Sequence, residues 1–249
     1  MRLIRCSEAA CLMKKIKIPS EIVYLISIVL LSLSVAMLTS VDFGISMIVA
    51  PAYLLSLKLG FLTFGQAEYV IQAVLFIILC IVLRRIKAVY LTSFLTCLIY
   101  GFVLDLWRLI PFFNPDVTAP GSMNITLRIV LFVVGVVLTS FSIALCFKTY
   151  LYPQVYDFSV KAVTARYKIK LSVFKTAFDF SCLAVALIMT FCFFGKLEGI
   201  GVGTLIMVAV NGTLIGFFSK MLDKTVECSP IFPKFAAHFS LDDGDAPNN

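Results

Sequence analysis

Residues 22–39 read IVYLISIVLLSLSVAMLT, a run of 18 residues that contains no charged side chain. A membrane-spanning helix needs about 20 predominantly apolar residues, with a tolerance of a few either way. Five further apolar runs follow, at residues 66–83, 88–106, 127–147, 176–194 and 200–219. These runs are continuously apolar rather than alternating, which favours helices over the strands of a barrel. The sequence therefore predicts an all-α membrane protein with about six transmembrane helices.

The composition agrees with a chain that is dissolved in lipid. Of its 249 residues, 61% are apolar and 14% are charged, whereas a soluble domain has about 25% charged residues. The net charge is +7, but the basic residues flank the apolar runs, where they orient the chain and contact head groups. No basic patch interleaved with aromatic residues is present, so the lipid bilayer and not a nucleic acid is the expected partner.

Two further segments are too short or too polar to cross the bilayer alone. Residues 45–57 contain Pro51, and residues 151–165 contain Pro153 together with two charged residues. We expect both to be half-helices or re-entrant segments, because irregular backbone survives at membrane depth only where it is buried in protein or lines a cavity. Two alternatives remain open: helices lying flat in the interface, or full crossings that would make eight spans.

The two halves of the chain resemble each other. Ser34-Val-Ala-Met in the first half resembles Ser142-Ile-Ala-Leu in the second, and Gly101 corresponds to Gly212 on the last run of each half. Three spans per half would insert the halves in opposite orientations, which is the 3+3 inverted repeat of many transporters.

This repeat divides the chain into five parts. They are a basic cytoplasmic segment (1–21), a first membrane repeat (22–107), an outer linker loop (108–126), a second membrane repeat (127–222) and a disordered cytoplasmic tail (223–249). With the N-terminus inside, 17 of the 21 Lys and Arg residues fall on the inner side. We therefore expect a multi-pass protein of the bacterial inner membrane with both termini cytoplasmic. Met13 is an alternative start to Met1.

Charged residues within the spans indicate where a solute site would lie, because an ionised group at the bilayer centre needs a cavity or a partner. Glu68 begins the second run and Asp179 begins the fifth, so an inverted repeat would place them at mirrored depths. Half-helix N-termini that point inward would add an anion-binding element. The predicted solute pathway consists of Glu68, Gln72, Asp179, Ser46, Pro51, Pro153 and Tyr156.

Other polar residues and several glycines have simpler interpretations. Asp105 and Arg128 lie at similar depths near the ends of their runs, where they would reach head-group water or pair with each other. Tyr100 and Asn211 are secondary candidates, and Asn211 is expected to bond across a helix contact. Glycines spaced by four residues let helix backbones approach closely in lipid. The glycines expected to pack in this way are Gly199, Gly203, Gly212 and Gly216.

The sequence does not favour an enzyme. The single histidine lies in the polar tail at position 238, so a membrane-embedded zinc protease or serine hydrolase would have no base or ligand. The eight cysteines show neither a CxxC pattern nor a disulfide framework. We expect no cofactor and no metal.

Several short motifs resemble those of the YczE/YitT-like bacterial membrane proteins. They are Gly44-x-Ser46 followed by Pro51, Phe64-Gly65, the basic turn at residues 84–87, and Gly199-x-Gly-x-Gly-Thr204. The resemblance covers residues 22–222 and implies a compact multi-span inner-membrane protein without an assigned activity. It carries over no catalytic residue. The chain departs from the YczE pattern after the first span, where it reads Gly44-Ile-Ser-Met.

The sequence thus leads to two hypotheses. The first is a small transporter or permease-like protein for a small solute, with its site between the halves. The second is an accessory membrane protein that captures a substrate for, or assembles, a membrane complex. The partner would be a membrane subunit or a second copy of the chain.

Overall fold

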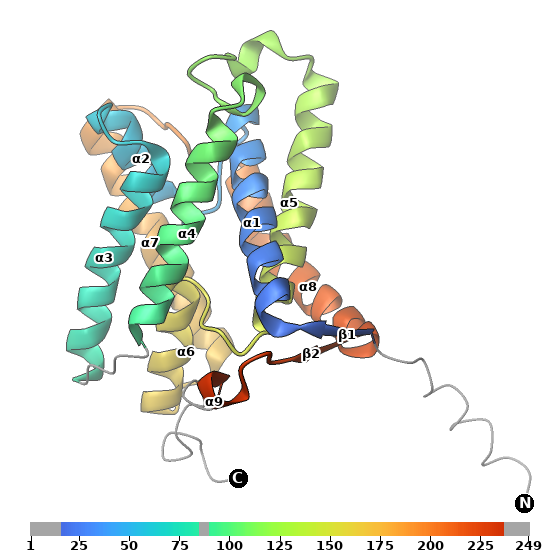
Figure 1. The fold of residues 1–249 in the computed structure, drawn as a ribbon. Helices are drawn as coiled ribbons and strands as arrows, with labels where there is room; N and C mark the ends of the chain where they lie inside the picture. Colours follow the sequence, from blue (N-terminus) through green and yellow to red (C-terminus); the bar gives the residue numbers. More distant parts are fainter. Residues whose placement is uncertain (1–15, 85–89, 237–249) are drawn as a thin grey trace, which may run out of the picture.

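In the part of the chain that the structure describes, six helices are long and apolar enough to cross a membrane, and they dominate the fold (Figure 1). The computed structural model describes residues 16–84 and 90–236. The long helices are α1 (Ser20–Val41), α3 (Phe64–Leu83), α4 (Leu91–Arg108), α5 (Ile125–Phe147), α7 (Leu171–Phe194) and α8 (Val202–Thr225). Each of them overlaps one of the six predicted runs, so the prediction of a polytopic helical membrane protein is confirmed.

The two proline-bearing segments form short helices, α2 (Ala50–Leu59) and α6 (Val155–Tyr167). With 10 and 13 residues they are about 15 and 20 Å long, well below the roughly 30 Å of the hydrocarbon core. The eight-span alternative therefore fails on length. Pro51 lies in the first turn of α2 and Pro153 precedes the N-cap of α6, where proline costs no helical hydrogen bond.

The two ends of the helix bundle carry different elements (Figure 1). One end, here called the loop end, carries the short 3-10 helices η3 (Pro111–Phe113) and η4 (Pro120–Ser122). The other, here called the strand end, carries the parallel pair β1 (Ile16–Pro19) and β2 (Val226–Ser229), followed by α9 (Pro233–Ala236).

The strand pair corrects one prediction. We expected disorder from residue 223 onward, but α8 continues to Thr225 and residues 226–229 pair with the segment that precedes α1. Glu21 also accepts hydrogen bonds from the backbone N–H of Ile231 at 3.0 Å and from the hydroxyl of Tyr150 at 2.7 Å. The basic N-terminal residues 1–15 with Met13, the turn at 85–89 and the tail at 237–249 lie outside the described residues.

The order of elements repeats, and most of the packing repeats with it. Span, short helix, span, span occurs first as α1 to α4 and again as α5 to α8. The equivalent pairs α1–α4 and α5–α8 both pack, as do α2–α3 and α6–α7, and α3–α6 and α7–α2. The two first helices, α1 and α5, pack extensively against each other at the centre.

The contact between the last two spans of each half departs most from this symmetry. α3 packs tightly on α4, but α7 and α8 form no extensive contact. At the α3–α4 contact, a Cβ on Gly65 would lie 2.1 Å from the carbonyl oxygen of Gly101. Gly212, which corresponds to Gly101 in the sequence repeat, has no atom within 4 Å of an added Cβ. The second half is therefore open where the first half is closed.

Candidate functional site

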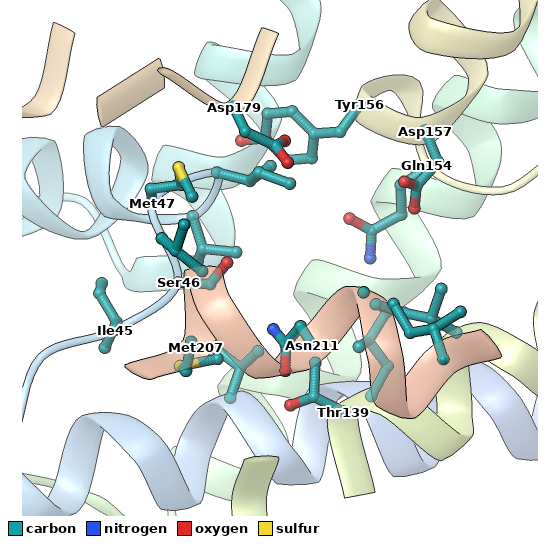
Figure 2. A pocket seen from close by; sticks show the side chains of 18 of the residues that line it. Ile45, Ser46, Met47, Thr139, Gln154, Tyr156, Asp157, Asp179, Met207 and Asn211 are labelled. Carbon is teal, nitrogen blue, oxygen red and sulfur yellow. The ribbon is translucent and has the colours of Figure 1, made fainter. Parts of the chain in front are cut away.

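A cavity of about 320 Å³ lies between the two halves of the molecule. Two segments reach it from opposite ends: the first tip (residues 45–49), which leads into α2, and the second tip (residues 154–157), which comprises the N-cap and the first residues of α6. The N-cap residues of both short helices, Val49 and Gln154, line this cavity. Side chains of α1, α4, α5, α7 and α8 complete its wall (Figure 2).

The first tip is fixed by backbone contacts with the start of α8. The Ile45 N–H donates to the Gly199 carbonyl at 3.2 Å, and the Thr204 hydroxyl donates to the Ile45 carbonyl at 2.8 Å. Gly44 has φ of +100°, and a Cβ there would lie 2.5 Å from the Gly201 nitrogen. Only glycine therefore permits both the conformation and the approach.

The second tip is fixed by a buried polar network from α3. Gln72 accepts from the Val155 N–H at 3.2 Å through its Oε1. Its Nε2 donates to Oε1 of Gln154 at 3.2 Å and to Oε2 of Glu68 at 3.0 Å. The Tyr156 hydroxyl donates to the same Oε2 at 3.0 Å. Of the four side chains in this network, the sequence analysis singled out Glu68, Gln72 and Tyr156 but not Gln154.

Glu68 lies behind Tyr156 rather than on the cavity wall. Its exposed fraction is 0%, and its Oε1 has no hydrogen-bond partner. Tyr156 lines the cavity, whereas Glu68 and Gln72 do not. The prediction that Glu68 and Gln72 border the solute pathway therefore needs correction: both reach it only through the second tip that they hold.

Charged side chains gather at one side of the cavity. Lys175 lies 3.5 Å from Oδ1 of Asp157 and 3.9 Å from Oδ1 of Asp179, and all three residues line the cavity. Oδ1 of Asp179 is buried without a hydrogen-bond partner. Two carboxylates thus share one ammonium group.

The remaining wall is mostly apolar. Ile45, Met47 and Met207 lie on the side away from Asp157 (Figure 2). Asn211 interrupts this surface from α8, and its Oδ1 accepts from the Ser140 hydroxyl on α5 at 3.2 Å, a bond between helices of the expected kind.

Residues 18–220 match DUF6198, a family of unknown function. The chain belongs to this family. No curated protein and no solved structure matches the chain. This DUF6198 protein is a membrane-spanning helical protein of a family of unknown function.

Among the other predicted residues, the DUF6198 chain brings Ser46, Asp179, Tyr100 and Asn211 to the cavity wall. Pro51 is buried in the first turn of α2 and Pro153 is buried before α6, so both shape the tips without lining the cavity.

The predicted pair of Asp105 and Arg128 is wrong. Asp105 accepts from the Thr63 hydroxyl at 2.6 Å and from the Gly65 N–H at 2.8 Å, so it satisfies donors at the start of α3. Arg128 donates to the Val41 carbonyl through Nε at 2.9 Å and Nη2 at 2.6 Å. Each residue thus binds the end of a neighbouring helix.

The four predicted packing glycines fall into two groups. A Cβ on Gly203 would lie 2.6 Å from the ring of Phe132, and one on Gly199 would lie 3.0 Å from the ring of Tyr53. Gly212 and Gly216 have nothing within 4 Å, so they make no such packing contact. Gly212 instead lines the cavity.

Sequence reasoning missed Gln154, Asp157 and Lys175 as cavity residues. Gln154 could have been found because it is a polar residue next to Pro153, in a segment that we expected to be re-entrant. Lys175 lies one residue before the predicted run 176–194, and Asp157 counted only as a charge that made residues 151–165 too polar to cross the bilayer. Within the described residues, no group of three His, Cys, Asp or Glu side chains could hold a metal ion.

Proposed function

We propose that this DUF6198 protein is a small transporter or permease-like protein whose solute occupies the cavity between the two repeats. The observation that carries this proposal is that the N-caps of both short helices, Val49 and Gln154, border one cavity. Short helices that break at membrane depth and face a shared site are the usual construction of secondary transporters. An apolar interior at this place would instead have favoured a protein without a solute route.

The broken symmetry supports a route that opens on alternate sides. The line of contact between two neighbouring helices is here called a seam. The seam between α3 and α4 is closed, because the helices meet at Gly65 and Gly101, while the equivalent seam between α7 and α8 is open at Gly212. In inverted-repeat transporters, exchange of the conformations of the two repeats moves the opening to the other side. On this proposal, the open α7–α8 seam is the access path of the conformation described here.

Uptake into proteoliposomes tests the proposal, using small amines, amino acids and carboxylates as candidate solutes. Gly212→Phe would place a ring in the cavity, and Gly216→Phe is its matched control because Gly216 lies one turn later and does not line the cavity. We expect at least one solute to enter faster than in protein-free liposomes, with uptake lost in Gly212→Phe and kept in Gly216→Phe. Uptake in Gly212→Phe equal to wild type, or no uptake of any solute, would refute the proposal.

The two carboxyl groups have separate roles in this proposal. Asp179→Asn removes a charge from the cavity wall, so we expect it to reduce uptake directly. Glu68→Gln keeps hydrogen-bonding capacity behind the second tip, so we expect a smaller loss of uptake. If both variants match the wild type, neither residue contributes to the route.

A second candidate function is an accessory membrane protein. It is favoured by α7 and α8, which have long apolar faces with few helix neighbours, including Ile188 and Phe191 on α7 and Leu205 and Phe217 on α8. Such faces suit lipid, a partner subunit or a second copy. Purification in a mild detergent tests this function: a stable partner at fixed stoichiometry, combined with no uptake, would favour it.

We also propose that the strand end faces the cytoplasm of a bacterial inner membrane. Basic residues near that end include Lys17, Lys148, Arg166, Lys168, Lys170 and Lys224, whereas the loop end has Lys58, Arg108, Arg128 and Lys196. The positive-inside rule places the richer end inside. Reporter fusions to residue 236 and to the 109–124 loop would test this orientation.

A further inference from the structure

We propose that the cavity binds a small amine that has an apolar body and an oxygen acceptor close to its ammonium group. This inference deepens the proposed function, because it names the class of solute, and it rests on the cavity being the solute site. Three features of the wall specify the three parts of this ligand.

The charged side of the cavity accounts for the ammonium group. Asp157 and Asp179 lie 3.5 and 3.9 Å from the single ammonium of Lys175, so the three side chains together carry one uncompensated negative charge. Asp179 has a buried Oδ1 without a hydrogen-bond partner. Buried acceptors of this kind are costly when they stay unpaired, and a ligand N⁺–H would supply both the missing donor and the missing charge.

Gln154 accounts for the oxygen acceptor. Its exposed fraction is 8%, its Oε1 is occupied by Gln72, and its Nε2 has no hydrogen-bond partner. Figure 2 shows this nitrogen pointing into the cavity. A buried amide N–H without an acceptor is rare in folded proteins, so a hydroxyl or carbonyl oxygen of a ligand is the group that would satisfy it.

Apolar side chains account for the body of the ligand. Leu31, Val35, Ile143, Met207 and Ile215 line the cavity from α1, α5 and α8. Methionine side chains are flexible and adapt to apolar ligands of different shapes. A cavity of about 320 Å³ is at the small end of ligand sites, which limits the body to a few carbon atoms.

The same wall disfavours an anion. A ligand carboxylate next to Gln154 would lie in a space shared with Asp157 and Asp179, and among the described residues that line the cavity Lys175 is the one cation. In a low-dielectric site, this repulsion outweighs one added hydrogen bond. We therefore expect the amine class to bind more tightly than zwitterions, and zwitterions more tightly than carboxylates.

Isothermal titration of the full chain in detergent tests this order with four probes that share one branched apolar body. They are leucinol, 3-methylbutylamine, leucine and 4-methylpentanoate. Leucinol, which has both the ammonium group and a hydroxyl, should bind most tightly, and 3-methylbutylamine next because it lacks the oxygen for Gln154. Leucine or 4-methylpentanoate binding as tightly as leucinol would overturn the proposal, and so would the absence of binding by all four probes.

Variants of cavity residues test whether leucinol binds in the cavity. Asp179→Asn should weaken leucinol binding by about tenfold or more, as expected for loss of a charge-assisted hydrogen bond. The matched control is Asp116→Asn, whose side chain is 69% exposed and pairs with Arg108 outside the cavity. Gly212→Phe should abolish binding while Gly216→Phe keeps it, and equal thermal unfolding of the two variants shows that both fold. Unchanged leucinol binding in Asp179→Asn or in Gly212→Phe would refute the assignment of the site.

Measurements of binding and of uptake together distinguish the failure of the transporter proposal from the failure of the proposed ligand class. Leucinol binding without uptake into proteoliposomes would refute the transporter and leave the ligand class intact. Uptake of solutes with no preference for amines would refute the ligand class and leave the transporter intact.

Discussion

The hydroxyl of Tyr156 on α6 donates to Oε2 of Glu68 on α3 at 3.0 Å, and Glu68 is fully buried. This bond joins residues from the two repeats and separates a buried carboxyl group from the cavity. It therefore ties the position of the second tip to the first repeat.

Removal of this donor should destabilise the protein. Tyr156→Phe leaves a buried carboxyl oxygen with fewer donors, so we expect a loss of about 1–3 kcal/mol in the free energy of unfolding. In a Glu68→Met background the same change should cost less, because no buried oxygen remains to be satisfied. Thermal unfolding in detergent measures both effects. Tyr69→Phe, which loses an exposed bond to the Leu98 carbonyl, is the control.

The first tip should tolerate no side chain at Gly44. Gly44→Ala would combine an unfavourable φ of +100° with a contact of 2.5 Å to the Gly201 nitrogen. Strain of the backbone alone costs about 1–3 kcal/mol, and the contact adds to it. Gly60→Ala is the control, because Gly60 has φ of +62° but nothing within 4 Å of an added Cβ. Equal losses of unfolding temperature in the two variants would show that the approach to α8 is unimportant.

Asp42 provides a prediction about pH. Burial raises the pKa of Asp42 above its ordinary value, and the negative charge of Glu198 raises it further. The folded protein therefore holds this proton to a higher pH than the unfolded chain does, and stability falls as pH rises through the raised pKa. Asp42 also caps the C-terminal end of α1 with φ of 53°, a conformation that asparagine tolerates.

Asp42→Asn should consequently stabilise the protein at about pH 8 by about 0.3–1 kcal/mol, the usual size of a charge effect at a helix end. The gain should shrink toward about pH 4, where the aspartate is increasingly protonated in both states. Unfolding temperatures at the two pH values check this. A gain that is the same at both would mean that the charge of Asp42 is not the cause.

Much of the fold could be predicted because bilayer thickness imposes a length on each apolar run. Residues 22–39 and 127–147 fall within α1 and α5 for this reason, and Pro51 and Pro153 marked the short helices. The strand pair could not be predicted, because Ile16–Pro19 and Val226–Ser229 are four-residue segments that meet only in the folded chain.

The sequence predicted the site residues that are polar within apolar runs, but it did not predict the positions that tertiary packing determines. Glu68, Asp179 and Tyr156 could be predicted because a polar group at membrane depth is energetically costly and requires a partner or a cavity. Tyr156 and Asp179 line the cavity, whereas Glu68 lies behind Tyr156, and only the folded structure shows this difference. Likewise, the spacing of Gly212 and Gly216 predicted close packing against another helix, but nothing lies within 4 Å of a Cβ added at either glycine. The resemblance to YczE/YitT-like proteins stays a prediction.

The central claim is that the two tips meet at a water-accessible cavity between the repeats. Thiol labelling in proteoliposomes tests it directly, in a chain whose accessible native cysteines are replaced by alanine. Ser46→Cys on the first tip and Thr176→Cys on the cavity wall should react with a hydrophilic thiol reagent, because the reactive thiolate requires water. Val185→Cys on the apolar outer face of α7 should not react. If Ser46→Cys and Thr176→Cys are as unreactive as Val185→Cys, the cavity is dry and the account is contradicted.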